Sequence, residues 1–319
     1  MIWLTWRQQR LETLLTGLAL ALAAALLVPI GTHMASVYTQ SGVAACVAHH
    51  TQNSASCSSA IDAFQTRFEH ASSLVPWLNL LPGLLGILLA APLVLELEHG
   101  TYRLAWTQSV TRRRWLTIRF AAIGLGALLA ALALTALMTW WREPLDHLQG
   151  RMGTNVFDFE GIVPYAYTLF AIALVVTIGA FTRRTVTAIG VSLLGFLALR
   201  ISIQSWLREH YSTPLKSIWP AGRLGPANLS KSWHLHAGFS DRLGHPLANV
   251  NAIFAACTRG PKGGSLDPSC LRAHGVYNHA IYQPASRFWL FQGIEAGIFV
   301  GLALILSAAA VWWMKERLI

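Results

Sequence analysis

The chain has 319 residues, of which 54% are hydrophobic and only 12% are charged. In soluble domains about a quarter of all residues are charged. The composition therefore excludes an ordinary soluble protein and predicts an all-α polytopic membrane protein. The formal net charge of +10 is carried largely by short connections between apolar runs, as a topology signal. Nucleic acid is therefore not an expected partner.

Six apolar runs are each about long enough to cross a hydrocarbon core of roughly 30 Å as a helix. Before the first run, residues 1–10 mix tryptophans with arginines, which is typical of an amphipathic helix in the headgroup layer. In the alternative, these residues extend the first span. The runs predict transmembrane helices over residues 11–32, 74–95, 120–141, 163–181, 186–207 and 288–314.

Basic residues cluster in four short segments that all fall on one side of this six-span arrangement. The positive-inside rule assigns that side to the cytoplasm. Both termini, including the tail 315–319, are therefore predicted to be cytoplasmic. The segments hold Arg7 and Arg10; Arg103, Arg112, Arg113, Arg114 and Arg119; Arg183 and Arg184; and Lys315 and Arg317.

The four cysteines all fall on the opposite, outer side. Cys46 and Cys57 lie in the first outer loop, and Cys257 and Cys270 lie in the connection between spans five and six. Two close pairs on one oxidising face predict two local disulfides, each contributing about 3 kcal/mol. Four free thiols are the alternative. Zinc is not expected at these cysteines, because neither pair has the short spacing of a zinc knuckle.

The connection 208–287 is too long for an unstructured loop and predicts an extracellular subdomain. Its many prolines and glycines argue against long helices there. The first outer loop, 33–73, predicts a small cap with one short helix over residues 59–68.

The second span is interrupted by helix-breaking residues. Broken helices within membranes face protein or a water-filled cavity. Asn79 and Pro82, with Gln292 in the last span, are therefore candidates for a translocation path, and a purely structural kink is the alternative. The interrupting residues are Pro76, Pro82, Gly83, Gly86 and Pro92.

Two charged residues fall inside predicted spans. Arg200 and Glu295 each lie about seven residues from the outer membrane face, or about 10 Å deep. Buried charges in membranes generally pair or reach water. The sequence therefore predicts an intramembrane ion pair between Arg200 and Glu295. In the alternative, both helix ends are shifted and each group reaches the interface.

Signatures of an enzyme are missing from the sequence. No Walker motif occurs, so this chain is not expected to hydrolyse ATP, and no catalytic arrangement of side chains stands out. Outer histidines such as His234, His236 and His245 invite a metal hypothesis, but their spacing is not diagnostic. Scattered surface histidines are the simpler account, and neither a metal nor a cofactor is expected in this chain.

The connection 96–119 is a short, basic, amphipathic insert between the second and third spans. Apolar runs on both sides anchor it at the cytoplasmic membrane surface. Its composition favours docking of a protein partner over binding of a small molecule.

This insert resembles the first cytoplasmic loop of ABC-2-type transporter permeases, whose pattern is E-x-G-T, a leucine-containing helix and then P-x-S-R. The matching residues are Glu98-x-Gly100-Thr101-x-x-Leu104 and Ser109-Val110-Thr111-Arg112-Arg113. The proline of the pattern is missing, because Val110 and Thr111 stand near the Pro and Ser positions. A bacterial subgroup is also similar at Trp3 to Gln8, at Pro284 to Gln292 and at Glu295.

The resemblance implies a permease subunit of the bacterial plasma membrane that dimerises with a second copy or a similar chain. A separate ATP-binding cassette subunit would hold ATP and Mg²⁺, and an amphiphile (a drug, peptide or lipid) would be exported by alternating access. The residues implied in docking that subunit are Glu98, Gly100, Thr101, Arg103, Leu104, Arg112 and Arg113.

Competing interpretations lack their expected sequence features. A membrane sensor or accessory protein, whose outer subdomain binds a ligand without transport, would need a cytoplasmic output domain. A membrane-embedded enzyme would need a catalytic cluster. A secondary transporter would show internal repeats and more intramembrane ionisable residues.

Overall fold

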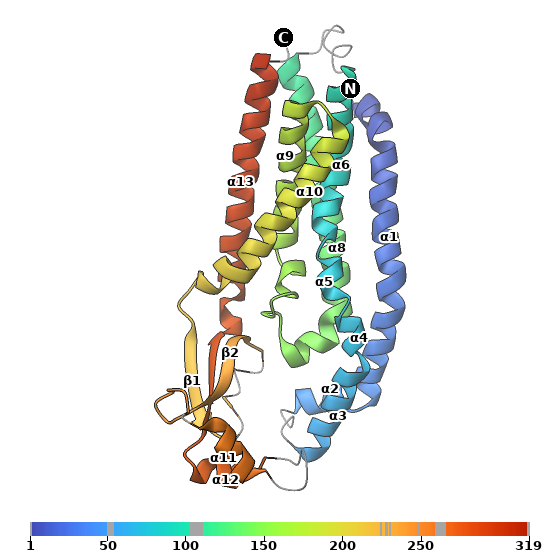
Figure 1. The fold of residues 1–319 in the computed structure, drawn as a ribbon. Coiled ribbons are helices and arrows are strands. Elements are labelled where there is room, and N and C mark those ends of the chain that lie inside the picture. Colours follow the sequence, from blue (N-terminus) through green and yellow to red (C-terminus); the bar gives the residue numbers. More distant parts are fainter. Residues whose placement is uncertain are drawn as a thin grey trace.

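The computed structural model describes residues 2–49, 54–101, 111–223, 225–226, 229, 231–247, 249–258 and 266–317, with the side chains of 2–9, 112–113, 116 and 317 left aside. Within these residues, six helical segments are long and apolar enough to cross a membrane, which confirms the predicted six-span membrane part. The two termini lie at one end of the bundle, which we name the terminal end (Figure 1).

The spans are longer than the apolar runs that predicted them. α1 and α8 have 39 and 38 residues, or about 58 Å at 1.5 Å per residue, nearly twice the hydrocarbon thickness. The backbone of residues 2–10 continues α1 without a break, as in the alternative of an extended first span. The main helices of the spans are α1 (Ile2–Gln40), α6 (Leu81–His99), α8 (Arg112–Gln149), α9 (Val163–Thr182), α10 (Thr185–Ser202) and α13 (Phe288–Arg317).

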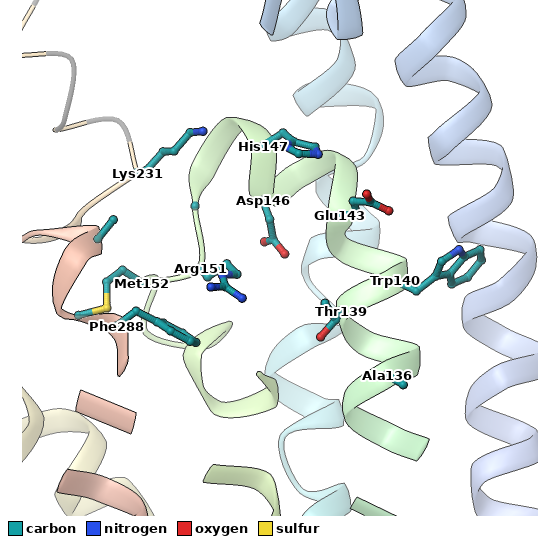
Figure 2. Close-up of a pocket in the computed structure, with 12 residues that line it drawn as sticks. Ala136, Thr139, Trp140, Glu143, Asp146, His147, Arg151, Met152, Lys231 and Phe288 are labelled. Carbon is teal, nitrogen blue, oxygen red and sulfur yellow. The ribbon is translucent and has the colours of Figure 1, made fainter. Parts of the chain in front are cut away.

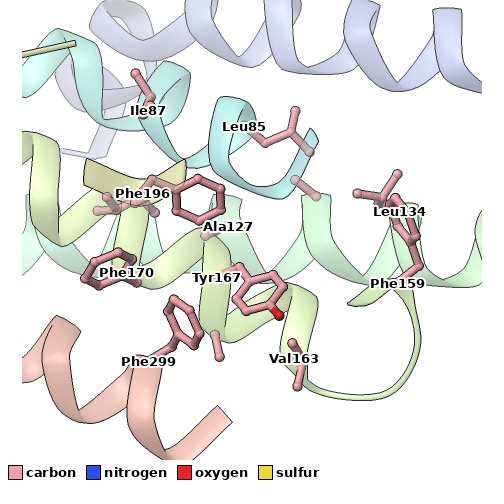
Figure 3. Packing of buried hydrophobic residues seen from close by; sticks show 14 of the residues in the cluster. Leu85, Ile87, Ala127, Leu134, Phe159, Val163, Tyr167, Phe170, Phe196 and Phe299 are labelled. Carbon is pink, nitrogen blue, oxygen red and sulfur yellow. The ribbon is translucent and has the colours of Figure 1, made fainter. Parts of the chain in front are cut away.

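α9 is the central helix and packs against α6, α8, α10 and α13. It is apolar all round, as expected for a helix surrounded by others. Small residues let α6 approach it closely. A Cβ on Gly86 would lie 2.5 Å from the Thr168 carbonyl oxygen, and one on Gly179 would lie 2.5 Å from a Val94 methyl carbon. Aromatic rings fill the core nearby (Figure 3): Tyr167, Phe170, Phe196 and Phe299.

The second span is broken into short helices, and two of its three prolines lie at the start of a helix. α4 (Glu69–Ser72) and α5 (Val75–Leu78) precede α6. Pro76 and Pro82 lie in the first turns of α5 and α6. Backbone N–H groups in a first turn make no hydrogen bond within the helix, so proline, which has no N–H, is tolerated there. Only Pro92 lies inside α6.

The first outer loop is helical over most of its described length. α2 (Val43–Ala48) and α3 (Ala55–Arg67) form a small cap beside the end of α1. The predicted helix over 59–68 begins four residues earlier, because Ser54 is its N-cap and accepts a hydrogen bond from the Cys57 N–H (3.4 Å).

The connection after α10 forms a subdomain with a sheet that sequence analysis did not predict. Three antiparallel strands lie in the order β1-β3-β2. Two short helices cover a small core of Ala221, Cys257, Leu271 and Val276. The elements are β1 (Leu215–Pro220), β2 (Trp233–Ser240), α11 (Val250–Cys257), α12 (Pro268–Ala273) and β3 (Tyr277–Gln283).

Both predicted disulfides are present. Cys46–Cys57 joins α2 to α3, with a Cα–Cα distance of 5.8 Å, and Cys257–Cys270 joins α11 to α12, with 5.4 Å. The cap and the subdomain that carry them lie at the end of the bundle opposite the termini (Figure 1). We name it the disulfide end.

We expect non-reducing peptide mass mapping to recover Cys46–Cys57 and Cys257–Cys270 and no other pairing. Each bridge closes a short loop, with sequence separations of 11 and 13. Replacing one pair by serines should therefore cost about 3 kcal/mol in unfolding free energy, measured by thermal unfolding in detergent with the other bridge intact as the control. Exchanged partners or four alkylatable thiols would contradict the pairing.

Candidate functional site

A buried cluster of four charged side chains lies at the disulfide end of the bundle. Asp158 comes from η1 (Phe157–Phe159), Arg200 from α10, Arg208 from η3 (Arg208–His210) and Glu295 from α13. Asp158 and Glu295 are fully buried, and Arg208 and Arg200 are 1% and 4% exposed. Charges buried to this extent require partners, because desolvation costs several kcal/mol per ion.

The four charges alternate in sign along one chain of ion pairs. Arg200 Nη2 lies 2.7 Å from Asp158 Oδ2, and Arg208 Nη2 contacts Asp158 Oδ1. Arg208 also binds Glu295 in bidentate fashion, through Nε to Oε2 (2.8 Å) and Nη2 to Oε1 (2.7 Å). The cluster has no net charge, and its centre is Arg208.

Neutral groups supply further hydrogen bonds to the cluster, although Arg200 Nε is buried without a hydrogen-bond partner in the described part of the chain. The Tyr167 hydroxyl lies 3.0 Å from Asp158 Oδ1 and also contacts Glu295 Oε1, and the Tyr211 hydroxyl donates to Glu295 Oε2 (3.2 Å). Two carbonyl oxygens accept from the arginines: that of Thr154 from Arg208 (2.9 Å) and that of Asn79 from Arg200. The Arg208 guanidinium also stacks 4.5 Å from the Phe157 ring centroid.

The prediction of a direct ion pair between Arg200 and Glu295 is wrong, because each residue binds another partner. Both residues belong to one cluster, but Asp158 and Arg208 stand between them. Sequence analysis missed Asp158 because it lies in a connection between spans, and it missed Arg208 because it follows the last residue of the predicted fifth span. A detectable signal was the pair of aromatic residues around Asp158, since Phe157 and Phe159 are both buried.

The predicted path residues hold the connection 150–162 against the bundle. Gln292 Oε1 accepts from the Ile162 and Val163 N–H groups (3.1 Å each), and its Nε2 donates to the Phe157 carbonyl oxygen (2.9 Å). Asn79 is buried at the break between α5 and α6, and Pro82 lies in the first turn of α6. These contacts give Gln292 a packing role, and Asn79 and Pro82 lie in the same broken segment that Arg200 contacts.

A second ionic group lies beside an open cavity. Arg142 Nε binds Asp146 Oδ1 (3.1 Å) within α8, and Arg151 Nη1 lies 3.2 Å from Glu160 Oε2. The neighbouring cavity has a volume of about 780 Å³, and Figure 2 shows Asp146 and Arg151 directed into it. Its wall includes Trp140, Glu143, Asp146, Arg151, Lys231 and Phe288.

Burial and the nearby Asp146 carboxylate raise the pKa of Glu160 from its ordinary 4.5 to about 8. Glu160 is 1% exposed, and within the residues that the structure describes neither of its carboxylate oxygens has a hydrogen-bond partner. The two arginines oppose this shift but do not cancel it. The pair therefore holds a proton near neutral pH.

At the terminal end, the predicted docking residues lie around the connection between α6 and α8. Glu98 is engaged within the chain, because its Oε2 accepts from the Thr185 N–H (2.9 Å) and hydroxyl at the start of α10. Gly100 ends α6 at φ 69°, a left-handed conformation that favours glycine. Thr101 follows Gly100, Arg112 and Arg113 form the first turn of α8, and Arg103 and Leu104 lie outside the described residues.

Among the described residues, one histidine lies close to potential thiol ligands. His274 is near Cys257 and Cys270, but those two sulfurs form a disulfide and offer no thiolate to a metal. His245 lies against Asp241 (3.2 Å). His234 contacts the Leu229 carbonyl oxygen (2.8 Å). These contacts do not assemble a metal site.

A family model described as ABC-2 membrane transporter related matches residues 17–208, more than half of the chain. The chain belongs to this family. The match includes most of the first span, spans two to five, the connection 96–119 and most of the buried cluster, whereas Glu295 lies beyond it. Searches of curated proteins and of solved structures returned no match.

Membership places the chain among the multi-pass membrane subunits of ABC-2 transporters. Such subunits work with an ATP-binding cassette partner. The family match also contains the whole connection 96–119 at the terminal end.

We expect Arg208→Met to destabilise the protein strongly, because it leaves Asp158 and Glu295 with a single positive partner. Breaking one member of a buried ionic group costs roughly 3–5 kcal/mol. Glu295→Gln in the same chain should recover much of this loss, since the Arg200–Asp158 pair then remains neutral. Unfolding in detergent, analysed as a double-mutant cycle, measures the coupling.

The matched cycle uses Arg200→Met with Glu295→Gln and should give weaker coupling, because these side chains do not touch. Glu209→Gln, which removes an exposed carboxylate next to Arg208, is the control for a local change in charge. Equal coupling in the two cycles would contradict the order of partners in the cluster.

The raised pKa of Glu160 makes stability depend on pH. The folded protein keeps a proton that the unfolded chain releases above pH 4.5, so this stabilisation is complete at low pH and is lost as the pH rises towards 8. The slope reaches about 1.4 kcal/mol per pH unit. Glu160→Gln should flatten the profile of unfolding free energy against pH, whereas Glu143→Gln on the same cavity should not. Parallel profiles for wild type and Glu160→Gln would contradict the shift.

Proposed function

We propose that this chain is the permease subunit of an ABC exporter and is driven by a separate ATP-binding subunit. The family match carries the proposal, because it includes the connection 96–119 between two spans at the end of the bundle where both termini lie. In this proposal the ATP-binding subunit docks on that connection. ATP and Mg²⁺ are then bound by that subunit, with no cofactor in this chain.

Contacts on both sides of the docking connection offer a route for transmitting its movement. Glu98 links the end of α6 to Thr185 at the start of α10. At the opposite end of α10, Arg200 binds Asp158 in the buried cluster. α10 thus joins the docking region to the cluster, because Thr185 and Arg200 lie on one rigid helix about 22 Å apart at 1.5 Å per residue. We infer that a push on the connection shifts α10 and opens or closes the disulfide end by alternating access.

The orientation follows from chemistry at the two ends. Disulfides persist in oxidising compartments, and the short basic connections belong in the cytoplasm. We therefore assign the disulfide end to the exterior of a bacterial plasma membrane and the terminal end to the cytoplasm. A second permease copy would complete the translocation path, and the substrate would be an amphiphile such as a drug, peptide or lipid.

One observation favours a second candidate function, a sensor or accessory protein that binds a ligand without transport. The outer subdomain contributes Lys231 to the wall of the 780 Å³ cavity, so a ligand there would contact both subdomain and bundle. Such a protein would bind its ligand without changing the rate of ATP hydrolysis by any partner. Transport-coupled ATPase activity therefore distinguishes the two functions.

We expect the double charge reversal Arg112→Glu with Arg113→Glu to abolish co-purification with the ATP-binding subunit, or to lower its substrate-stimulated ATP hydrolysis at least tenfold. The reversal places two negative charges on the first turn of α8, inside the proposed interface. The partner in this experiment is a co-expressed ATP-binding subunit that carries a Walker motif.

The matched control reverses two exposed arginines at the disulfide end, Arg223→Glu with Arg242→Glu, and should leave both readouts unchanged. Unchanged co-purification and ATP hydrolysis in the Arg112 and Arg113 variant would overturn the docking assignment. A permease that forms no complex with any ATP-binding subunit would overturn the proposed function itself.

A further inference from the structure

Two cavities lie along α8 and α13, and we name the strip of surface between these helices, from one cavity to the other, the groove. Both helices pack on α9, which forms the floor between them. Nearer the terminal end, a second and smaller cavity of about 110 Å³ lies between the same three helices. Its wall is almost entirely apolar and includes Ile123, Leu169, Ile172, Val300 and Leu304.

The spacing of the two cavities matches one leaflet of a membrane. Ala136 on α8 and Phe288 on α13 line the larger cavity, and Gly124 and Val300 line the smaller one. On each helix the two residues are twelve positions apart. At 1.5 Å per residue the nearest walls of the two cavities are about 18 Å apart along each helix. Half of a hydrocarbon core of roughly 30 Å is about 15 Å.

Small residues leave room along α13 between the cavities. Gly293, Gly297, Val300 and Leu304 follow helical spacing and share one face. A Cβ on Gly293 or Gly297 would meet no atom within 4 Å, so the space beside them is open. An alkyl chain can lie along such a face.

Exposed tryptophans place the larger cavity at headgroup depth. Tryptophan is enriched at the boundary between the hydrocarbon core and water. Four spans expose one near the disulfide end, and Trp140 itself lines the cavity. They are Trp77, Trp140, Trp206 and Trp289, exposed by 74%, 43%, 67% and 60%.

The larger cavity separates charges of opposite sign. Glu143 and Asp146 lie on α8, whereas Arg151 and Lys231 come from the following loop and from the subdomain (Figure 2). Asp146 already pairs with Arg142, and Arg151 pairs with Glu160, so Lys231 and Glu143 are the charges that face a ligand. A phosphate diester suits Lys231, and a primary ammonium, with three N–H donors, suits Glu143. An anionic headgroup without an ammonium would leave Glu143 unmatched.

We propose that the groove between α8 and α13 binds a zwitterionic phospholipid with a primary ammonium headgroup, of which phosphatidylethanolamine is the simplest example. The headgroup occupies the larger cavity, and one acyl chain follows α13 to the smaller one. The phospholipid belongs to the leaflet at the disulfide end. This inference does not depend on transport or on the ATP-binding subunit.

The test measures lipid binding to the purified full chain by native mass spectrometry in detergent, with phosphatidylethanolamine, phosphatidylcholine and phosphatidylglycerol as probes. We expect phosphatidylethanolamine to bind at least about tenfold more tightly than the other two. Lys231→Gln should weaken the binding of all three lipids, because it removes a contact to the phosphate. Glu143→Gln should remove the preference for phosphatidylethanolamine while retaining phosphatidylglycerol.

A third variant tests the acyl path. Gly297→Leu should weaken binding of all three lipids by filling the groove, whereas Gly190→Leu, at an equally open position on α10, should not. Arg242→Gln and Glu69→Gln, two exposed charges at the same end but outside the cavity, are the controls for the headgroup variants. Thermal unfolding of each variant excludes a general loss of structure.

Several results would overturn the inference. Equal affinity for the three lipids would reject the charge match, and variants indistinguishable from their controls would reject the groove as the site. Loss of a dimer in Gly297→Leu, without any change in lipid binding, would assign the groove to a second copy of the chain. Co-purification with the ATP-binding subunit is measured separately, so its failure leaves the lipid result interpretable.

Discussion

Arg208 is the residue on which the disulfide end of the bundle depends. Its guanidinium is almost fully buried and lies between two carboxylates that are themselves inaccessible to water. A buried charge must be offset by partners close by, because the medium around it does not solvate it. Three segments that are distant in sequence are held together by this requirement: the connection 150–162, the end of the fifth span and the last span.

The packing of the connection 150–162 follows from the same constraint. Asp158 reaches the arginines only if this connection folds back into the bundle, and Gln292 holds it there by capping the start of α9. Gly161 makes the close approach possible. It has a positive φ of 69°, and a Cβ at this position would lie 2.7 Å from Gln292 Oε1.

The two ionic groups at the disulfide end differ in how completely they are satisfied. Around Arg208, carboxylates, hydroxyls and carbonyl oxygens surround the two arginines in a closed core, and all three Arg208 nitrogens have partners, although Arg200 Nε is buried without one among the described residues. Around Asp146, Arg142 Nη2 and both Glu160 carboxylate oxygens are buried without a hydrogen-bond partner in the part of the chain that the structure describes, and the pKa of Glu160 is raised. The first group therefore serves as a lock between segments. The second lies beside a cavity and is open to a ligand and to changes in pH.

Local sequence pattern is enough to predict several features of this protein. Apolar runs of membrane length identified six spans, and close cysteine spacing identified the Cys46–Cys57 and Cys257–Cys270 bridges. The family followed from a contiguous motif beginning at Glu98. Each of these signals lies within a few tens of residues, so no knowledge of packing was required.

The choice of ionic partners, in contrast, depends on how the chain packs in three dimensions. Arg200 and Glu295 lie at similar predicted depths below the outer membrane face. The carboxylate that Arg200 binds is nevertheless that of Asp158, 42 residues earlier, and Glu295 binds Arg208, 87 residues away in sequence. The carboxylate of Glu98 is similarly taken up by Thr185, across the bundle. Partner choice depends on how helices pack and where connections fold back. That is a balance of desolvation and geometry over the whole chain, which periodicity and residue spacing do not encode.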